Sequence, residues 1–226
     1  STITWLFAGE IRHQDSLGID LVIRPGEVNW MTAGRGIVHS ERSPKSSRRA
    51  KAKLAGIQAW MALPLAKEEI EPAFYHYSAD ELPCYQQEGI RLVLIAGQAF
   101  GQRSPIKTES DTFYAELRLD KDTSFVLPAD IPERGIYVYE GSITIGGTTF
   151  NSGTLTVLKP GLAVELTATD DALCMLLGGA PLEGERHLYW NFVSSSKARI
   201  EKAKQDWREN RFPLVPGDHE YIPLPE

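Results

Sequence analysis

The sequence predicts an all-β fold of antiparallel sheets with one C-terminal helix. Glycine and proline recur at intervals of roughly ten residues, and the runs between them are rich in Val, Ile, Leu, Thr and Tyr, which is typical of an antiparallel sandwich or barrel. Helix signals are few. With 226 residues and 42% apolar composition, the chain can bury a substantial core, as one β domain or as two closely packed ones.

Each expected strand is a short apolar, β-branched or aromatic run. The strands are expected at 2–8, 20–24, 27–31, 55–62, 91–96, 112–119, 135–139, 142–145, 154–158, 162–168 and 172–177. Residues 43–53 are polar and basic and are expected to form an exposed loop, whereas 211–226 is expected to be a proline-rich extended tail. Because Ser1 leads directly into the first strand without an initiator Met, we expect the chain to be truncated, with its natural start upstream.

The C-terminal helix is expected over residues 196–210. A hydroxyl from the three serines at 194–196 can cap its first turn. Ile200, Ala203 and Trp207 then recur at helical spacing and form one apolar stripe, while the remaining positions are mostly charged. This pattern predicts a surface helix that packs through a single face.

Two segments of the chain share a glycine frame, which indicates an internal repeat. Gly26 and Gly34 are eight positions apart, as are Gly153 and Gly161, and each pair brackets an apolar strand. Both frames follow a strand that ends in a hairpin glycine. The sequence therefore predicts two copies of one β unit.

Charge and cysteine content exclude several classes of function. The formal net charge is -6, and the basic cluster at 48–53 has no interleaved aromatic residues, so direct nucleic-acid binding is not expected. Cys84 and Cys174 form no CxxC motif, which argues against a disulfide scaffold or a zinc ribbon and favours the reducing cytoplasm. No apolar run approaches the roughly 18 residues that a membrane span requires, so no membrane association is expected.

The glycine frame also points to candidate metal ligands. Five residues beyond the second glycine lies His39 in the first copy and Leu166 in the second, and two residues further lie Glu41 and Ala168. In a strand, residues i and i+2 project from the same face, so His39 and Glu41 are expected to converge. An imidazole and a carboxylate on one face are suitable ligands for a divalent metal of the iron class.

The other four histidines are weaker candidates. His13 lies in an expected hairpin, where it is either a solvated turn residue or a partner of the metal ligands. His76, His187 and His219 each stand alone in polar or loop contexts and are expected to be structural. No nucleophile motif, GxGxxG or P-loop is present, so nucleophilic catalysis and phosphate binding are not indicated.

The run Pro-Gly-Glu-Val-Asn-Trp-Met-Thr-Ala-Gly-Arg-Gly-Ile-Val-His-Ser-Glu at 25–41 resembles the signature of the pirin family, a branch of the cupin superfamily. The resemblance continues through Gln-Ala-Trp at 58–60, Gly-Gly-Ala-Pro-Leu at 178–182 and Trp-Asn-Phe-Val at 190–193. It therefore extends over essentially the whole chain.

The resemblance implies a bicupin, with an N-terminal cupin domain at 1–105 and a C-terminal cupin domain with the helix and tail at 106–226. It implies one mononuclear iron in the N-terminal domain, held by three histidines and one glutamate, of which His39 and Glu41 are the third histidine and the carboxylate. The family's first two histidines belong to a His-Pro-His stretch that this sequence does not contain. We therefore expect Fe(II) binding by this chain to be weak or absent.

Two functions follow from the resemblance. One is a quercetin 2,3-dioxygenase that, in its full-length form, opens the flavonol ring; Glu41 would be the catalytic base for the 3-hydroxyl proton, and a flavonol-like molecule would be the substrate. The enzyme would have an apolar cavity lined by residues such as Trp30, Met31 and Ile37, which are otherwise ordinary core. The alternative is a non-enzymatic, iron-dependent redox-sensing regulator that binds a transcription factor or a metabolic enzyme. A monomer or weak dimer is expected in either case.

Overall fold

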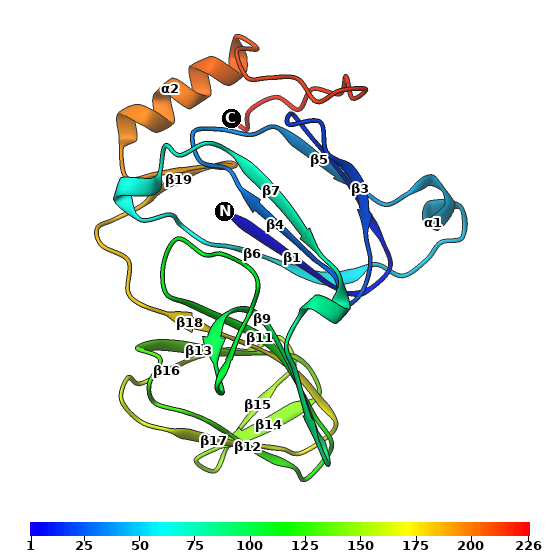
Figure 1. The fold of residues 1–226 in the computed structure, drawn as a ribbon, viewed down its shortest axis with the longest axis vertical. Coiled ribbons are helices and arrows are strands. Elements are labelled where there is room, and N and C mark those ends of the chain that lie inside the picture. Colours follow the sequence, from blue (N-terminus) through cyan, green and yellow to red (C-terminus); the bar gives the residue numbers. More distant parts are fainter. The chain divides into compact units, whose positions relative to one another are not determined.

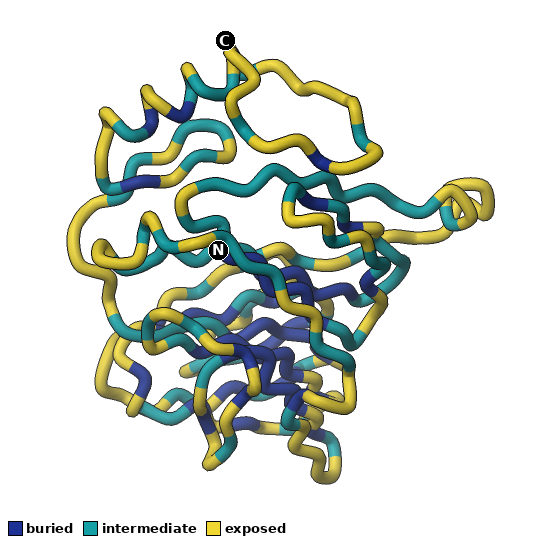
Figure 2. The backbone as a smooth tube through the Cα atoms, turned by 45° about the horizontal axis from the view of Figure 1, so that its top comes forward, coloured by how far each residue is buried: buried dark blue, intermediate teal, exposed yellow.

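The computed structural model describes residues 1–226 as two compact units (Figures 1 and 2). The first unit comprises Ser1–Ala79 and Leu182–Glu226, and the second comprises Asp80–Pro181. Both are built mainly from antiparallel strands, which confirms the expected two-domain β fold with a C-terminal helix.

The division differs from the expected boundary at 105. Strand β9 (Ile90–Ala99) pairs with β11 (Thr112–Leu119) along nearly its whole length, so hydrogen bonding places it in the second unit. The C-terminal segment returns to the first unit, where Ser195 N donates to Glu68 Oε1 at 3.1 Å. In Figure 1 the orange and red end of the chain accordingly lies with the blue strands.

The first unit contains two main sheets and a two-stranded sheet formed by β19 (His187–Tyr189) and β20 (Phe192–Ser194). The larger has the order β6-β1-β4-β7, and the smaller has the order β3-β2-β5. The strands are β1 (Thr2–Ala8), β2 (Ile11–Asp15), β3 (Asp20–Ile23), β4 (Val28–Thr32), β5 (His39–Arg42), β6 (Ala55–Trp60) and β7 (Ala73–Tyr77). The expected set lacks β2 and β5, which are largely polar, and β7, whose sequence Ala-Phe-Tyr-His-Tyr does not alternate apolar with polar residues.

The second unit also contains two sheets. The larger has the order β10-β9-β11-β18-β13-β16 with β8 paired to β9, and the smaller has the order β12-β17-β14-β15. The remaining strands are β8 (Cys84–Gln87), β10 (Gln102–Arg103), β12 (Ser124–Leu127), β13 (Glu133–Glu140), β14 (Ser142–Ile145), β15 (Thr148–Asn151), β16 (Leu155–Leu158), β17 (Val164–Ala168) and β18 (Ala172–Gly179). Their inward side chains form a continuous apolar core.

Helix is confined to a few segments. Helix α2 (Lys197–Arg208) begins where the Oγ of Ser196 accepts from Arg199 N, and it buries Ile200 and Ala203 as its apolar stripe predicts. A single turn, α1 (Lys45–Arg49), interrupts the loop expected at 43–53. The other elements are η1 (Leu65–Lys67), η2 (Ala79–Glu81), β19 (His187–Tyr189) and β20 (Phe192–Ser194). None of the helices is both long and apolar enough to cross a membrane.

The two units repeat one strand arrangement, as the glycine frame predicts. Strand β1 pairs with β4 and β6 as β13 pairs with β16 and β18, and β2 pairs with β5 as β14 pairs with β17. Gly9 and Gly141 end β1 and β13 with positive φ. A Cβ at Gly9 would lie 2.5 Å from the Lys53 carbonyl oxygen, and one at Gly141 would lie 2.1 Å from the Asp171 carbonyl oxygen. Only glycine fits both places without strain.

Candidate metal centre

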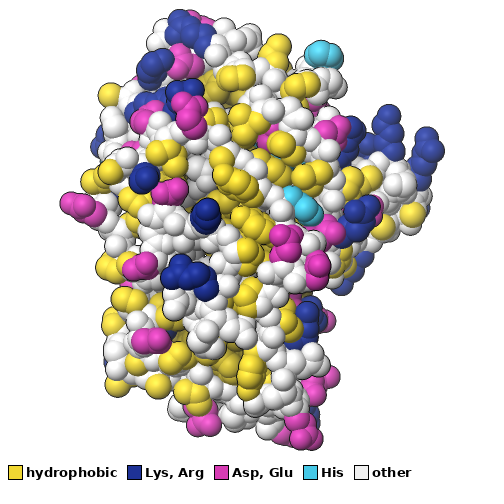
Figure 3. Space-filling view, viewed as in Figure 1, with side chains coloured by type: hydrophobic (Ala, Val, Ile, Leu, Met, Phe, Trp, Pro, Cys, Tyr) yellow, Lys and Arg dark blue, Asp and Glu magenta, His cyan; other side chains and the backbone are white.

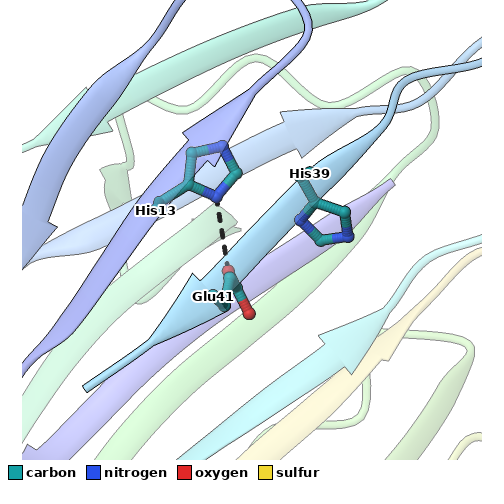
Figure 4. A group of neighbouring side chains, drawn as sticks. All are labelled: His13, His39 and Glu41. Carbon is teal, nitrogen blue, oxygen red and sulfur yellow. Dashed lines mark hydrogen bonds and ion pairs between the residues drawn. The ribbon is translucent and has the colours of Figure 1, made fainter. Parts of the chain in front are cut away.

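His39 and Glu41 project from the same face of β5, as strand alternation predicts (Figure 4). A third residue, His13 on β2, joins them. One ligand atom from each of the three side chains lies within 4.8 Å of the others. These residues are called here the His-Glu cluster.

His13 is held in the cluster by strand register. Strands β2 and β5 pair so that His13 lies opposite Glu41 and Asp15 lies opposite His39. The His13 Nε2 is 3.1 Å from Asp15 Oδ2, and its Nδ1 is 3.5 Å from Glu41 Oε1. The ring is 1% exposed and stacks on Phe74 at a centroid distance of 4.3 Å. His13 is therefore no solvated turn residue; with both nitrogens engaged, it orients the Glu41 carboxylate.

Gln58 on β6 fixes the other oxygen of Glu41. Its Nε2 donates to Glu41 Oε2 at 2.8 Å and to Thr4 Oγ1 at 3.0 Å. Sequence reasoning did not select Gln58 as a site residue. The available signal was that it is the one polar side chain in the otherwise apolar run of β6.

The surroundings shift the pKa values of the three members of the His-Glu cluster in different directions. Burial lowers the pKa of His39, an effect that the nearby Glu41 carboxylate offsets only in part. Burial alone would also lower the pKa of His13, but its hydrogen bonds to Glu41 and Asp15 outweigh burial and raise it. Burial alone would raise the pKa of Glu41, yet the His13 hydrogen bond and the His39 charge lower it. At neutral pH His39 is therefore neutral and Glu41 ionised, which are the states that bind metals.

One atom of the cluster lacks a partner. The Nδ1 of His39 is buried and makes no hydrogen bond. Buried polar groups are nearly always hydrogen-bonded, so the lone pair of this nitrogen is available to bind an ion. A neutral imidazole beside an ionised carboxylate is a donor set that suits a divalent metal of the iron class, so these residues fit such an ion.

The other expected positions lie outside the cluster. His76 on β7 is 2.9 Å from Asn29 Oδ1 through its Nδ1. Met31 lies opposite Phe74 in the β4–β7 ladder and therefore shares the face that stacks on His13. Trp30, its neighbour along β4, projects from the opposite face. Of the three expected lining residues, Met31 is thus directed toward the cluster and Trp30 away from it, while Ile37 lies in the connection between β4 and β5.

Comparison with known proteins agrees with this arrangement. Two β units with a His-Glu cluster in one of them define a two-domain cupin. The family model described as "Pirin" matches residues 1–61, and that described as "Pirin C-terminal cupin domain" matches residues 114–213. A pirin-like protein of Caulobacter vibrioides is 47% identical over 228 residues, covering 100% of this chain and 78% of the relative. The chain belongs to the pirin family.

Solved structures show the same fold. A quercetin 2,3-dioxygenase from Acinetobacter baumannii superposes with a TM-score of 0.90 at 29% identity, over 100% of this chain and 75% of the other. The bacterial pirin YhhW from Escherichia coli, solved in complex with nickel(II), superposes with a TM-score of 0.63 at 25% identity, over 80% and 72% of the two chains. The chain spans 65% to 78% of the length of three curated relatives.

Proposed function

We propose that the protein is a mononuclear non-haem iron protein with quercetin 2,3-dioxygenase activity toward a flavonol-like substrate. The observation that carries this proposal is the pairing of a neutral His39, whose Nδ1 is buried and unpartnered, with an ionised Glu41. The likeness to a solved quercetin 2,3-dioxygenase supports the choice of reaction. The free thiols of Cys84 and Cys174 support a reducing, cytoplasmic location.

His39 and Glu41 would hold the iron. When bound, the ferrous ion supplies Lewis acidity and redox chemistry with dioxygen. His13 and Gln58 contact one carboxylate oxygen of Glu41 each and so restrict its rotation. Groups that orient metal ligands in this way raise metal affinity and fix the geometry of the site.

Glu41 would be the base for the flavonol 3-hydroxyl proton. A base must be ionised before it can accept a proton, and the lowered pKa of Glu41 meets this condition at neutral pH. The proton would be held at Oε1 or Oε2. The His13 Nδ1, 3.5 Å from Oε1, would stabilise the carboxylate when the proton leaves again.

The test is turnover by the iron-loaded protein. The protein is loaded anaerobically with ferrous iron, its metal content is measured, and quercetin absorbance is followed together with oxygen uptake. We expect quercetin and oxygen to be lost in equal amounts and in proportion to the iron that is bound, with no loss in His39→Ala. Equal turnover by wild type and variant would refute the assignment of His39.

The alternative is a regulator whose iron alters a docking surface. In the same experiment it predicts the same His39-dependent iron binding, but no consumption of quercetin or oxygen. Redox-dependent binding to a transcription factor or a metabolic enzyme would then be the activity to measure.

A further inference from the structure

A strongly basic segment joins the two strands that carry Glu41 and Gln58. Residues 43–54, called here the basic loop, connect β5 to β6 and include α1. Five of the nine residues from 45 to 53 are lysine or arginine, and no acidic residue occurs between Glu41 and Glu68. In Figure 3 dark blue side chains gather on the projecting segment that carries α1 in Figure 1. This concentration of positive charge is found in a chain whose net charge is -6.

The cations of the basic loop are exposed and have no carboxylate partner. The five are Lys45, Arg48, Arg49, Lys51 and Lys53. Most arginines elsewhere are paired: Arg12 with Asp20 at 2.5 Å, for example. The one acid that touches the loop, Glu10, accepts from Ser47 at 2.9 Å and already pairs with Arg24 at 3.1 Å. Most of the other arginines are thus neutralised by a carboxylate, whereas the positive charge of the basic loop remains available.

The arrangement of the cations concentrates their field on one side. Lys45, Arg48 and Arg49 are three and four residues apart on α1, so they share a helix face. Like charges at this spacing repel each other, and an anion bound between them would relieve the repulsion. Leu54 is 47% exposed at the end of the loop and offers an apolar contact beside the charges.

We propose that the basic loop is a docking surface for an acidic, extended polypeptide segment of a partner protein. Charge complementarity supplies the attraction, and arginine favours carboxylates because its guanidinium can donate to both oxygens. A nucleic acid is the poorer occupant, because residues 43–54 contain no aromatic side chain on which a base could stack. A membrane surface is also poorer, because one exposed leucine is too little apolar area to anchor the loop. The proposal is independent of the chemistry at the His-Glu cluster.

The experiment measures binding of a fluorescent decapeptide of alternating Glu and Asp by anisotropy at low salt. The loop variant replaces Arg48, Arg49, Lys51 and Lys53 with Gln. A matched control variant replaces four exposed lysines outside the loop with Gln, so that the net charge changes equally; these are Lys107, Lys121, Lys159 and Lys197. Circular dichroism verifies that both variants fold.

We expect the loop variant to bind the peptide roughly tenfold more weakly than wild type, and the control variant to bind within about twofold of wild type. Binding should weaken as salt is raised, because exposed charges are screened. No binding by the wild type, or equal losses in both variants, would overturn the proposal. Loop-dependent binding that is tighter to a single-stranded oligonucleotide or to anionic phosphatidylserine vesicles than to the peptide would also overturn it.

Discussion

The two units place opposite kinds of side chain at matching positions of the same strand pair. In the β2–β5 pair of the first unit, His13 lies opposite Glu41. In the corresponding β14–β17 pair of the second unit, Ile143 lies opposite Ala168, and both are fully buried. One register position thus carries a charged, hydrogen-bonded pair in one unit and an apolar contact in the other.

The replacement of polar residues of the first unit by apolar residues extends to further inward positions of the second unit. Asp15 and His39 of the first unit correspond to Ile145 and Leu166 of the second. In the larger sheets, the Thr4–Gln58 pair corresponds to Ile136–Leu176. The residues of the second unit at these positions belong to its apolar core or pack against it.

The difference shows what a binding site costs the fold. Each fully buried leucine or isoleucine stabilises the second unit by roughly 1.5–3 kcal/mol relative to an exposed one. Polar side chains at the same places give up that gain and must be hydrogen-bonded to avoid a further penalty. One strand arrangement therefore serves either as packed support or as a site, depending on a handful of inward residues.

Leu166→His should give the largest effect, because it places the imidazole of the first unit inside the second unit without its partners. Leu166 is fully buried, so we expect a loss of about 3–5 kcal/mol in the free energy of unfolding, measured with denaturant. The control is Val126→His on the neighbouring strand β12, where the side chain is 53% exposed and the loss should be below about 0.5 kcal/mol. Similar losses in the two variants would show that the second interior is not the packed core described above.

His39→Ala should lower ferrous iron affinity roughly 100-fold, because it removes a proposed ligand and not only its support. Titration against a competing chelator measures the change. His76→Ala is the matched control, since His76 lies in the same unit but hydrogen-bonds Asn29 outside the cluster. If both variants lose affinity alike, the metal is not held by the His-Glu cluster.

Gln58→Leu should lower iron affinity roughly tenfold, because Glu41 would lose the hydrogen bond that fixes its Oε2. The change installs the residue type found at the matching place in the second unit. The free energy of unfolding should therefore stay within about 1 kcal/mol of wild type. Unchanged affinity would mean that Gln58 does not orient the carboxylate.

The smallest effect concerns pH. Because the pKa of His13 is raised in the folded protein, the stability that His13 contributes is fully present below its unfolded value of 6.5 and is lost as pH rises through the folded pKa. The difference in unfolding free energy between wild type and His13→Gln should thus be larger at pH 6 than at pH 9. A difference that is constant or grows with pH would contradict the ion pairs assigned to His13.

Much of the fold could be predicted because apolar alternation marks its strands. The repeat could be predicted from glycines at turns where the backbone has a positive φ, which glycine adopts readily, and the shared face of His39 and Glu41 from strand alternation alone. His13 could not be assigned in advance, because β2 reads Ile-Arg-His-Gln-Asp and is defined by its ladder to β5, 28 residues away in the His13–Glu41 pair. The return of the segment from Leu182 to the first unit could not be predicted, because its partners there are far from it in sequence.

The most direct test is anomalous diffraction at the iron edge from crystals of the protein saturated anaerobically with ferrous iron. We expect one peak within bonding distance of His39 and Glu41, and none among the apolar side chains around Leu166. A peak at any other place, or no peak at the His-Glu cluster in protein shown to contain iron, would contradict the assignment of His39 and Glu41 as metal ligands.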